Sequence, residues 1–138
     1  MSDLTQLYQE IILGHNKQPR NYGALGDPCS KADGNNPLCG DEVTVYWNIL
    51  DDKITQLSFE AQGCAISRAS ASMMTELLKG RSLEEARSLF ARIDSYLTSH
   101  AVAEMPEEFG ELVALAGVRK FPSRIKCATL AWQTFLGK

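Results

Sequence analysis

The sequence predicts a single α+β domain in which a small antiparallel sheet packs against several helices. Two strand-like segments follow one another in the first half of the chain, and segments with helical periodicity lie before and after them. The chain has 138 residues, of which 44% are hydrophobic, and this fits one domain of ordinary size with a real core. We therefore expect residues 1–138 to form one domain.

The chain is expected to begin with a helix and a long loop. Asp3 and Gln6 resemble a capping box, apolar residues then recur at helical spacing, and Gly14 is expected to end the helix. Proline and glycine interrupt the segment 15–40 repeatedly. This composition predicts a long irregular loop, and loops of that length are often functional.

Apolar residues alternate with polar ones on both sides of a turn at residues 51–53, which predicts a β-hairpin. The first strand is expected to place Val43, Val45, Trp47 and Ile49 on one face, and the second strand Thr55, Leu57, Phe59 and Ala61. Because an isolated hairpin is only marginally stable, we expect helices to cover its apolar face.

Four helices are expected after the hairpin. The first runs from about 66 to 79, and the second follows a capping box formed by Ser82 and Glu85. A short third helix is expected over 107–116. Ser123 is a good N-cap residue for the last helix. This order of elements supports a single α+β domain.

The composition argues against nucleic-acid binding and against membrane insertion. The net charge is −3, with 14 basic and 17 acidic residues, whereas nucleic-acid binders are usually basic. No apolar stretch approaches the roughly 20 residues that a membrane-spanning helix needs. The first residues lack the basic and apolar regions of a signal peptide, so we expect a cytoplasmic protein.

The chain has four cysteines, Cys29, Cys39, Cys64 and Cys127, and no pair of them forms a CxxC motif. In a reducing cytosol such cysteines favour metal binding or thiol chemistry over disulfides. The alternative is four unrelated thiols, since free cysteine is common in cores. A joint site would have to be assembled by the fold.

Three of the cysteines are expected at the ends of elements. Cys39 precedes the first strand, Cys64 lies between the second strand and the next helix, and Cys127 is expected in the first turn of the last helix. The dipole at a helix N-terminus favours a thiolate, the form that binds metal and attacks sulfur. With Asp41, two residues after Cys39, they would complete a tetrahedral zinc site. The alternative for Asp41 is a capping or turn residue.

Basic residues flank two of these cysteines. Arg68 follows Cys64 by one helical turn, and Arg124 and Lys126 surround Cys127. Their charges could lower a thiol pKa or attract an anionic sulfur species. The alternative is a solvated basic patch.

Three other reactive side chains are expected to take no part in the site. Cys29 lies in the long loop and is interpreted as a bystander thiol. His15 and His100 have no partner at ligand spacing, so we expect ordinary surface or helix-end residues.

Three motifs, in this order, are similar to those of the IscU/SufU/NifU-N family of iron–sulfur cluster assembly proteins. They are NPLCGD at 36–41, GCAISRASASMM at 63–74 and GVRKFPSRIKCATLAW at 117–132. The resemblance covers nearly the whole chain and implies the SufE/NifU-like fold. It also implies that the metal ligands are Cys39, Asp41, Cys64 and Cys127.

Within this family the chain resembles the SufU branch. Lys126 stands where the IscU branch carries a histidine, and residues 81–104 resemble an extra stretch of SufU proteins. The segment 120–124 also replaces the LPPVK-type chaperone-recognition sequence of IscU. The SufU resemblance implies a tightly held zinc ion and a sulfurtransferase role. Sulfur would come from a SufS-type cysteine desulfurase, be accepted on Cys39, and pass to downstream acceptors.

Two other functions remain open from the sequence. The chain could be a scaffold that holds a transient [2Fe–2S] cluster for transfer to apoproteins, because cysteines ligate clusters as well as zinc. It could also be an adaptor with a purely structural zinc ion. The lysine at position 126 argues against the scaffold function, and the loop position of Cys39 argues against a purely structural zinc ion.

Overall fold

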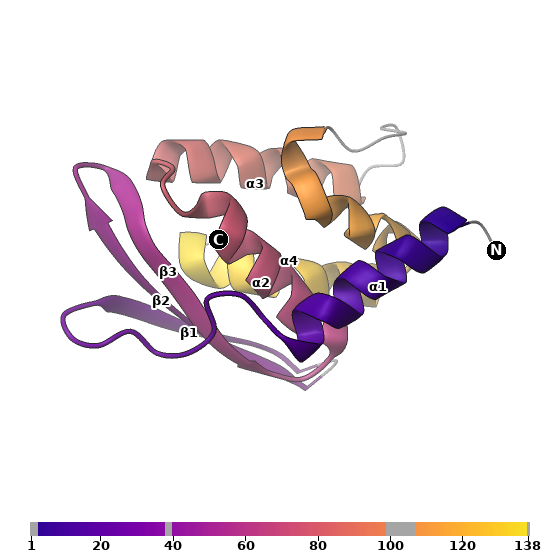
Figure 1. Cartoon of the computed structure of the whole chain (residues 1–138), viewed down its shortest axis with the longest axis horizontal. Helices are drawn as coiled ribbons and strands as arrows, with labels where there is room; N and C mark the ends of the chain where they lie inside the picture. Colours follow the sequence, from indigo (N-terminus) through magenta and orange to yellow (C-terminus); the bar gives the residue numbers. More distant parts are fainter. Residues whose placement is uncertain (1–2, 38–39, 99–106, 138) are drawn as a thin grey trace.

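The computed structural model describes residues 3–37, 40–98 and 107–137, and shows one sheet with helices before and after it (Figure 1). In chain order its elements are α1 (Asp3–Lys17), β1 (Ser30–Asn36), β2 (Asp41–Leu50), β3 (Lys53–Gln62), α2 (Ala65–Leu78), α3 (Leu83–Thr98), the 3₁₀ segment η1 (Glu107–Lys120) and α4 (Pro122–Leu136). None of the helices within the described ranges is both long and apolar enough to cross a membrane.

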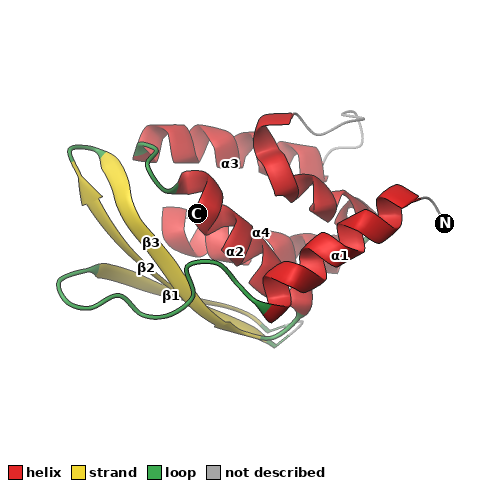
Figure 2. Cartoon of the chain, in the orientation of Figure 1, coloured by secondary structure: helices red, strands yellow, loops and turns green. Residues whose placement is uncertain are grey.

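The three strands form one antiparallel sheet in the order β1-β2-β3, and the helices gather on one side of it (Figure 2). Helices α2 and α4 contact the strands, α3 packs against α4, and α1 packs against α2 and η1. The predicted α+β class is therefore confirmed. The core lies between the inner face of the sheet and the helices, where Phe59 and Trp132 are fully buried.

Strand β1 lies inside the segment that was expected to be an irregular loop, so that expectation was wrong for Ser30–Asn36. The strand is polar and lacks an alternation of large apolar residues, because it forms an edge of the sheet. It also passes close to α4 at Gly34, where an added Cβ atom would collide with the side chain of Thr134. The position of β1 is therefore determined by its backbone pairing with β2 and by its close approach to α4, rather than by the burial of side chains.

The predicted hairpin is present as β2 and β3, but its second strand starts in a different phase. Leu57 and Phe59 face the core as expected, whereas Thr55 is exposed and Ile54 is fully buried. The pairing register shifts between Asn48 and Ile49. Such an irregularity changes which side chains face inward, and simple alternation does not predict it.

Two predicted helix ends differ from the structure. Helix α1 continues past Gly14 to Lys17. Helix α4 begins at Pro122, with Phe121 as its N-cap and no side-chain cap, so Ser123 is not the N-cap residue. Proline suits the first turn of a helix because its missing N–H would have no helical partner there.

The predicted capping box before α3 is confirmed. The backbone N–H of Ser82 donates to Glu85 Oε1 at 3.0 Å, and the N–H of Glu85 donates to Ser82 Oγ at 3.1 Å. The hydrogen bonds from Ser82 lower the pKa of Glu85 below its usual value.

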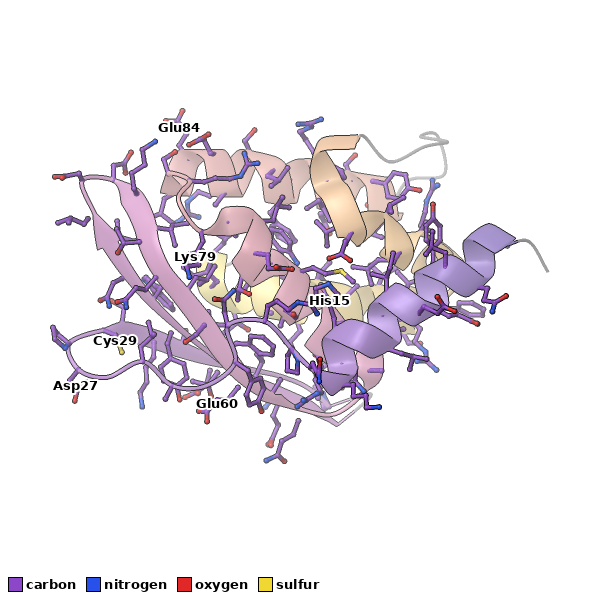
Figure 3. All side chains as sticks on the ribbon, in the orientation of Figure 1. His15, Asp27, Cys29, Glu60, Lys79 and Glu84 are labelled. Carbon is purple, nitrogen blue, oxygen red and sulfur yellow. The ribbon has the colours of Figure 1, made fainter. Side chains whose placement is uncertain are left out.

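His15 is not a surface residue, because only 1% of it is exposed (Figure 3 labels its side chain). Its Nδ1 atom lies 2.7 Å from Ser72 Oγ on α2, and its Nε2 atom lies 2.9 Å from Glu111 Oε1 on η1. The periodicity of α1 did not reveal this role, since both partners are distant in sequence. The imidazole joins three helices through hydrogen bonds.

We expect His15→Ala to lower the free energy of unfolding by about 2–4 kcal/mol, because it leaves a cavity and removes one hydrogen-bond partner of the buried Ser72 hydroxyl, which also accepts from the backbone N–H of Arg20. Urea unfolding followed by circular dichroism measures this change. Glu10→Ala, at an exposed position of α1, is the matched control and should shift the value by less than about 0.5 kcal/mol. Equal effects of the two variants would contradict the structural role of His15.

Candidate metal centre

Three of the four expected ligands converge at one end of the sheet. Asp41 is the first residue of β2, Cys64 directly precedes α2, and Cys127 lies on α4. One carboxylate oxygen and the two sulfur atoms all lie within 4.8 Å of one another. The fourth expected ligand, Cys39, lies outside the described residues. The fold thus brings together side chains that are up to 86 positions apart in sequence.

Asp41 is buried, with 1% of it exposed, and the start of α2 holds its carboxylate. The backbone N–H of Cys64 donates to Asp41 Oδ1 at 2.8 Å, while Oδ2 lies 3.7 Å from Cys64 Sγ. Gly63 makes this approach possible, because an added Cβ atom there would lie 2.7 Å from the Cα atom of Asp41. Asp41 is therefore more than a turn residue: it begins β2, and its carboxylate is held against the start of α2.

Cys64 lies between β3 and α2, as expected, and it is the N-cap residue of α2. Its Sγ atom accepts a hydrogen bond from the backbone N–H of Ser67 at 3.4 Å. The sulfur atom therefore lies at the N-terminal end of the helix, beside a backbone N–H donor.

Cys127 is not in the first turn of its helix and is not at an element end. Helix α4 begins at Pro122, which places Cys127 in the second turn, and the residue is fully buried. Cys127 therefore lies farther from the N-terminus of its helix than Cys64 does, and the dipole argument made from the sequence does not apply to it. Instead, Asn36 Nδ2 donates a hydrogen bond to Cys127 Sγ at 3.6 Å.

The chemistry of this donor set fits a metal ion. Two sulfur atoms and a carboxylate are ligand types that zinc prefers, and a buried carboxylate needs a compensating charge. Among the described residues, no lysine, arginine or histidine forms an ion pair with Asp41. A divalent cation among the three side chains would supply the missing positive charge.

Arg68 is not simply a solvated residue, because its guanidinium is held by hydrogen bonds to other parts of the chain. Its Nη1 atom donates to the Ala61 carbonyl at 2.7 Å, and its Nε atom donates to Asn16 Oδ1 at 3.1 Å. The guanidinium also lies over the Tyr22 ring, 5.1 Å from its centre. Arg68 therefore ties α1 and the following loop to α2.

Arg124 and Lys126 are both exposed on the first turns of α4. Their positions suit the solvated basic patch that was one of the two expectations, and they leave room for contact with an anionic partner.

Cys29 lies at the opposite end of β1 from the candidate centre (Figure 3). It is half-buried, and its Sγ atom lies 3.7 Å from the carbonyl oxygen of Leu25. This position agrees with the interpretation of Cys29 as a bystander. His100 lies outside the described residues.

A second group, His15, Glu76 and Glu111, also places three ligand atoms within 4.8 Å. Both ring nitrogens of His15 lie within hydrogen-bonding distance of a side-chain oxygen, and the two glutamates are about half exposed. Hydrogen bonds within the protein thus explain why His15 is buried at this position, without a metal ion.

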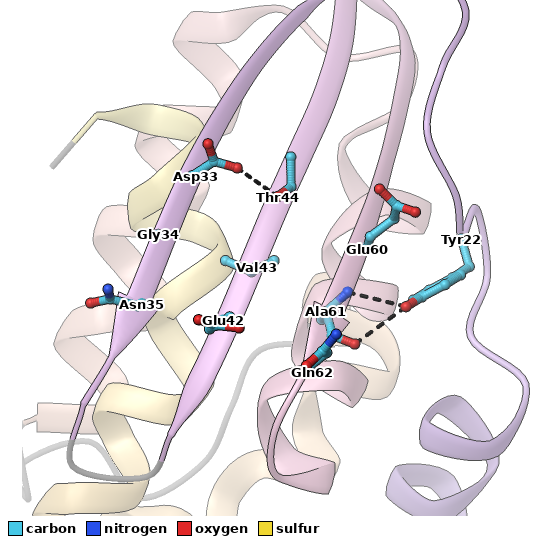
Figure 4. Close-up of a pocket in the computed structure, with 10 residues that line it drawn as sticks. All are labelled: Tyr22, Asp33, Gly34, Asn35, Glu42, Val43, Thr44, Glu60, Ala61 and Gln62. Atoms are coloured by element: carbon cyan, nitrogen blue, oxygen red, sulfur yellow. Dashed lines mark hydrogen bonds between the residues drawn. The ribbon is translucent and has the colours of Figure 1, made fainter.

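The outer face of the sheet carries a separate pocket of about 630 Å³ (Figure 4). Its lining includes the acidic residues Asp33, Glu42 and Glu60. Tyr46 donates to Glu60 at 2.6 Å, and this hydrogen bond, burial and nearby negative charges raise the pKa of Tyr46 to about 12. The three side chains of the candidate centre do not line this pocket.

Reasoning from the sequence missed two residues of the centre, Asn36 and Gly63. Both lie inside the motifs quoted above, but neither side chain is a ligand or a nucleophile. A positive φ at Gly63 and a hydrogen bond between Asn36 and Cys127, 91 positions apart, become visible only in the folded chain.

Known proteins are similar to this chain both in sequence and in fold. Residues 7–128 match the family described as "NifU-like N terminal domain". The chain is 42% identical over 132 residues to the zinc-dependent sulfurtransferase SufU of Bacillus subtilis strain 168, covering 96% of this chain and 88% of that protein. It is 43% identical over 132 residues to the iron–sulfur cluster assembly scaffold protein IscU of Streptococcus pyogenes serotype M1, covering 96% and 82%.

The crystal structure of the N-terminal part of a nitrogen-fixing NifU-like protein from Brucella abortus superposes with a TM-score of 0.85. The match has 25% identity and covers 99% of this chain and 94% of that one. Sequence and fold agree, and the chain therefore belongs to the NifU-like N-terminal domain family, together with the SufU and IscU proteins.

Proposed function

We propose that this protein is a zinc-dependent sulfur acceptor in iron–sulfur cluster assembly. It takes persulfide sulfur from a SufS-type cysteine desulfurase and passes it to downstream acceptors. The observation that carries the proposal is the convergence of Asp41, Cys64 and Cys127 within 4.8 Å. The similarity to a SufU protein whose name states zinc dependence and sulfur transfer supports it further.

The zinc ligands in this proposal are the three converging residues and Cys39, which follows Asn36 by three positions and precedes Asp41 by two. A bound zinc ion would keep the thiols deprotonated at neutral pH and protect them from oxidation. Asp41 is the weakest donor of the set, which suits a site that exchanges one ligand during turnover.

Cys39 is proposed as the residue that accepts sulfur. Its thiolate attacks the outer sulfur of the persulfide on the desulfurase. A new S–S bond forms at Cys39, the S–S bond on the desulfurase breaks, and the desulfurase cysteine leaves as a thiolate. The exchange needs no external oxidant or reductant. A thiol of the next acceptor can remove the sulfur from Cys39 by the same chemistry.

The second candidate function is a scaffold for a [2Fe–2S] cluster. The similarity to the Streptococcus pyogenes scaffold protein favours it, and cysteine ligands suit iron–sulfur clusters as well as zinc. Lys126, at the position where the resemblance to the IscU branch would place a histidine, argues against it.

Desulfurase turnover with the zinc-loaded, iron-free protein distinguishes these two functions. Under anaerobic, reducing conditions, we expect a catalytic amount of the protein to raise alanine release from cysteine at least about tenfold. The reason is that a transfer partner removes the persulfide sulfur and so frees the desulfurase cysteine for another turnover. The reduced, metal-free protein is the control. An active desulfurase that is not stimulated, together with cluster formation on the protein after iron is added, would favour the scaffold function.

A further inference from the structure

Each of the three converging side chains accepts a hydrogen bond from an N–H group of the protein. The backbone N–H of Cys64 donates to Asp41, and the backbone N–H of Ser67 donates to Cys64. Both of these donors lie at the N-terminal end of α2, Cys64 as its N-cap residue and Ser67 in its first turn. The third donor is the side-chain amide of Asn36, which reaches Cys127 from the sheet.

Asn36 is well placed to connect the parts of the centre. It is the last residue of β1, is 6% exposed, and pairs in register with Asp41 on β2. Its side chain crosses to α4 and donates to Cys127 Sγ at 3.6 Å, within the range for a hydrogen bond to sulfur. The backbone of one residue thus lies beside one ligand while its side chain contacts another.

We propose that Asn36 is a positioning residue that keeps Cys127 as a permanent ligand of the metal centre. This inference rests on the proposed function, because it assumes that the thiols bind zinc. An N–H donor fixes the direction of the sulfur lone pairs and withdraws charge from the thiolate. Cys127 is thereby held in place and made a weaker nucleophile, so that sulfur exchange is directed to a different thiol.

The test compares Asn36→Asp with Asn35→Asp. The two substitutions add the same charge at adjacent positions of β1, but Asn36 is buried against Cys127 and Asn35 is exposed. We expect zinc release to a chromogenic chelator to be about 10–100-fold faster in Asn36→Asp, the usual effect of losing an outer-shell hydrogen bond. Asn35→Asp should release zinc within about twofold of the wild-type rate.

Two further measurements separate positioning from a general loss of structure. Asn36→Ala removes the donor without adding a charge, and serves if Asn36→Asp does not fold. In the cobalt-substituted protein, loss of the hydrogen bond should shift the sulfur-to-cobalt charge-transfer band, whereas a merely less stable protein would keep the wild-type band. Near-ultraviolet circular dichroism establishes that each variant is folded.

The outcomes distinguish this inference from the proposed function. Folded Asn36→Asp and Asn36→Ala proteins with wild-type zinc release and an unshifted cobalt band would overturn the role of Asn36 and leave the zinc centre intact. Equal acceleration by Asn35→Asp would also overturn it. A wild-type protein that retains no zinc would overturn the proposed function together with this inference.

Discussion

Replacing Cys39 with serine is expected to abolish sulfur transfer. A serine hydroxyl remains protonated at neutral pH and cannot form a persulfide, so the proposed acceptor atom is lost. Stimulation of the desulfurase should be lost, so that alanine release falls by at least about tenfold, to the rate of the desulfurase alone. Alanine release measures this loss, and mass spectrometry of the protein after turnover should show no added sulfur.

Cys29→Ser is the matched control for this experiment. It is the same substitution in the same polypeptide, at a half-buried thiol that directly precedes β1, at the end of this strand far from Asp41. Sulfur transfer by this variant should stay within about twofold of the wild-type rate, because a substitution at a partly exposed position away from the metal centre usually has little effect. A Cys39→Ser protein with full transfer would exclude Cys39 as the acceptor, and loss of transfer in Cys29→Ser would assign a role to the second thiol.

The zinc content of Cys39→Ser separates two reasons for a loss of activity. The three other proposed ligands converge in the structure, and we expect them to retain zinc, although more weakly than four ligands do. A folded Cys39→Ser protein that holds zinc and accepts no sulfur would assign a reactive role to Cys39. A protein that has lost its zinc would instead assign it a role in binding.

The sequence predicted those parts of the fold that depend on burying large apolar side chains. Val43, Val45 and Phe59 show the alternation of a half-buried strand, and the structure buries all three. Strand β1 has no such pattern, because backbone pairing and the close approach of Gly34 to Thr134 determine its position. His15 likewise depends on partners in other helices.

The candidate site was predicted where ligand chemistry could be recognised from residue type. Asp41, Cys64 and Cys127 were expected as ligands, and the fold brings them within 4.8 Å of one another. Their electrostatic environment was predicted less well. The dipole argument applies to Cys64, whereas the side-chain amide of Asn36 contacts Cys127. A donor on a strand that the sequence did not predict could not be assigned to the site.

Gly63→Ala is expected to disrupt the metal centre without altering any of its ligands. Gly63 has a φ of +127°, which residues with a side chain rarely adopt, and an added Cβ atom would collide with Asp41 Oδ1. Asp41 is buried against the start of α2, and the added Cβ atom would also lie 2.7 Å from its Cα atom, so the backbone of β2 would have to shift. We expect zinc release at least about 100-fold faster than in the wild type, because a ligand itself is displaced.

Gly80→Ala is the control that isolates backbone strain from the collision. Gly80 has a φ of +88°, and an added Cβ atom there would have no neighbour within 4 Å. In the metal-free state, backbone strain should cost each variant about 1–3 kcal/mol of the free energy of unfolding, since both force alanine into a positive φ. Gly63→Ala should lose more than Gly80→Ala, because only its added Cβ atom collides with Asp41. Only Gly63→Ala should also release zinc rapidly. If the two variants released zinc at the same rate, the contact between Gly63 and Asp41 would have no part in metal binding, and strain alone would account for both.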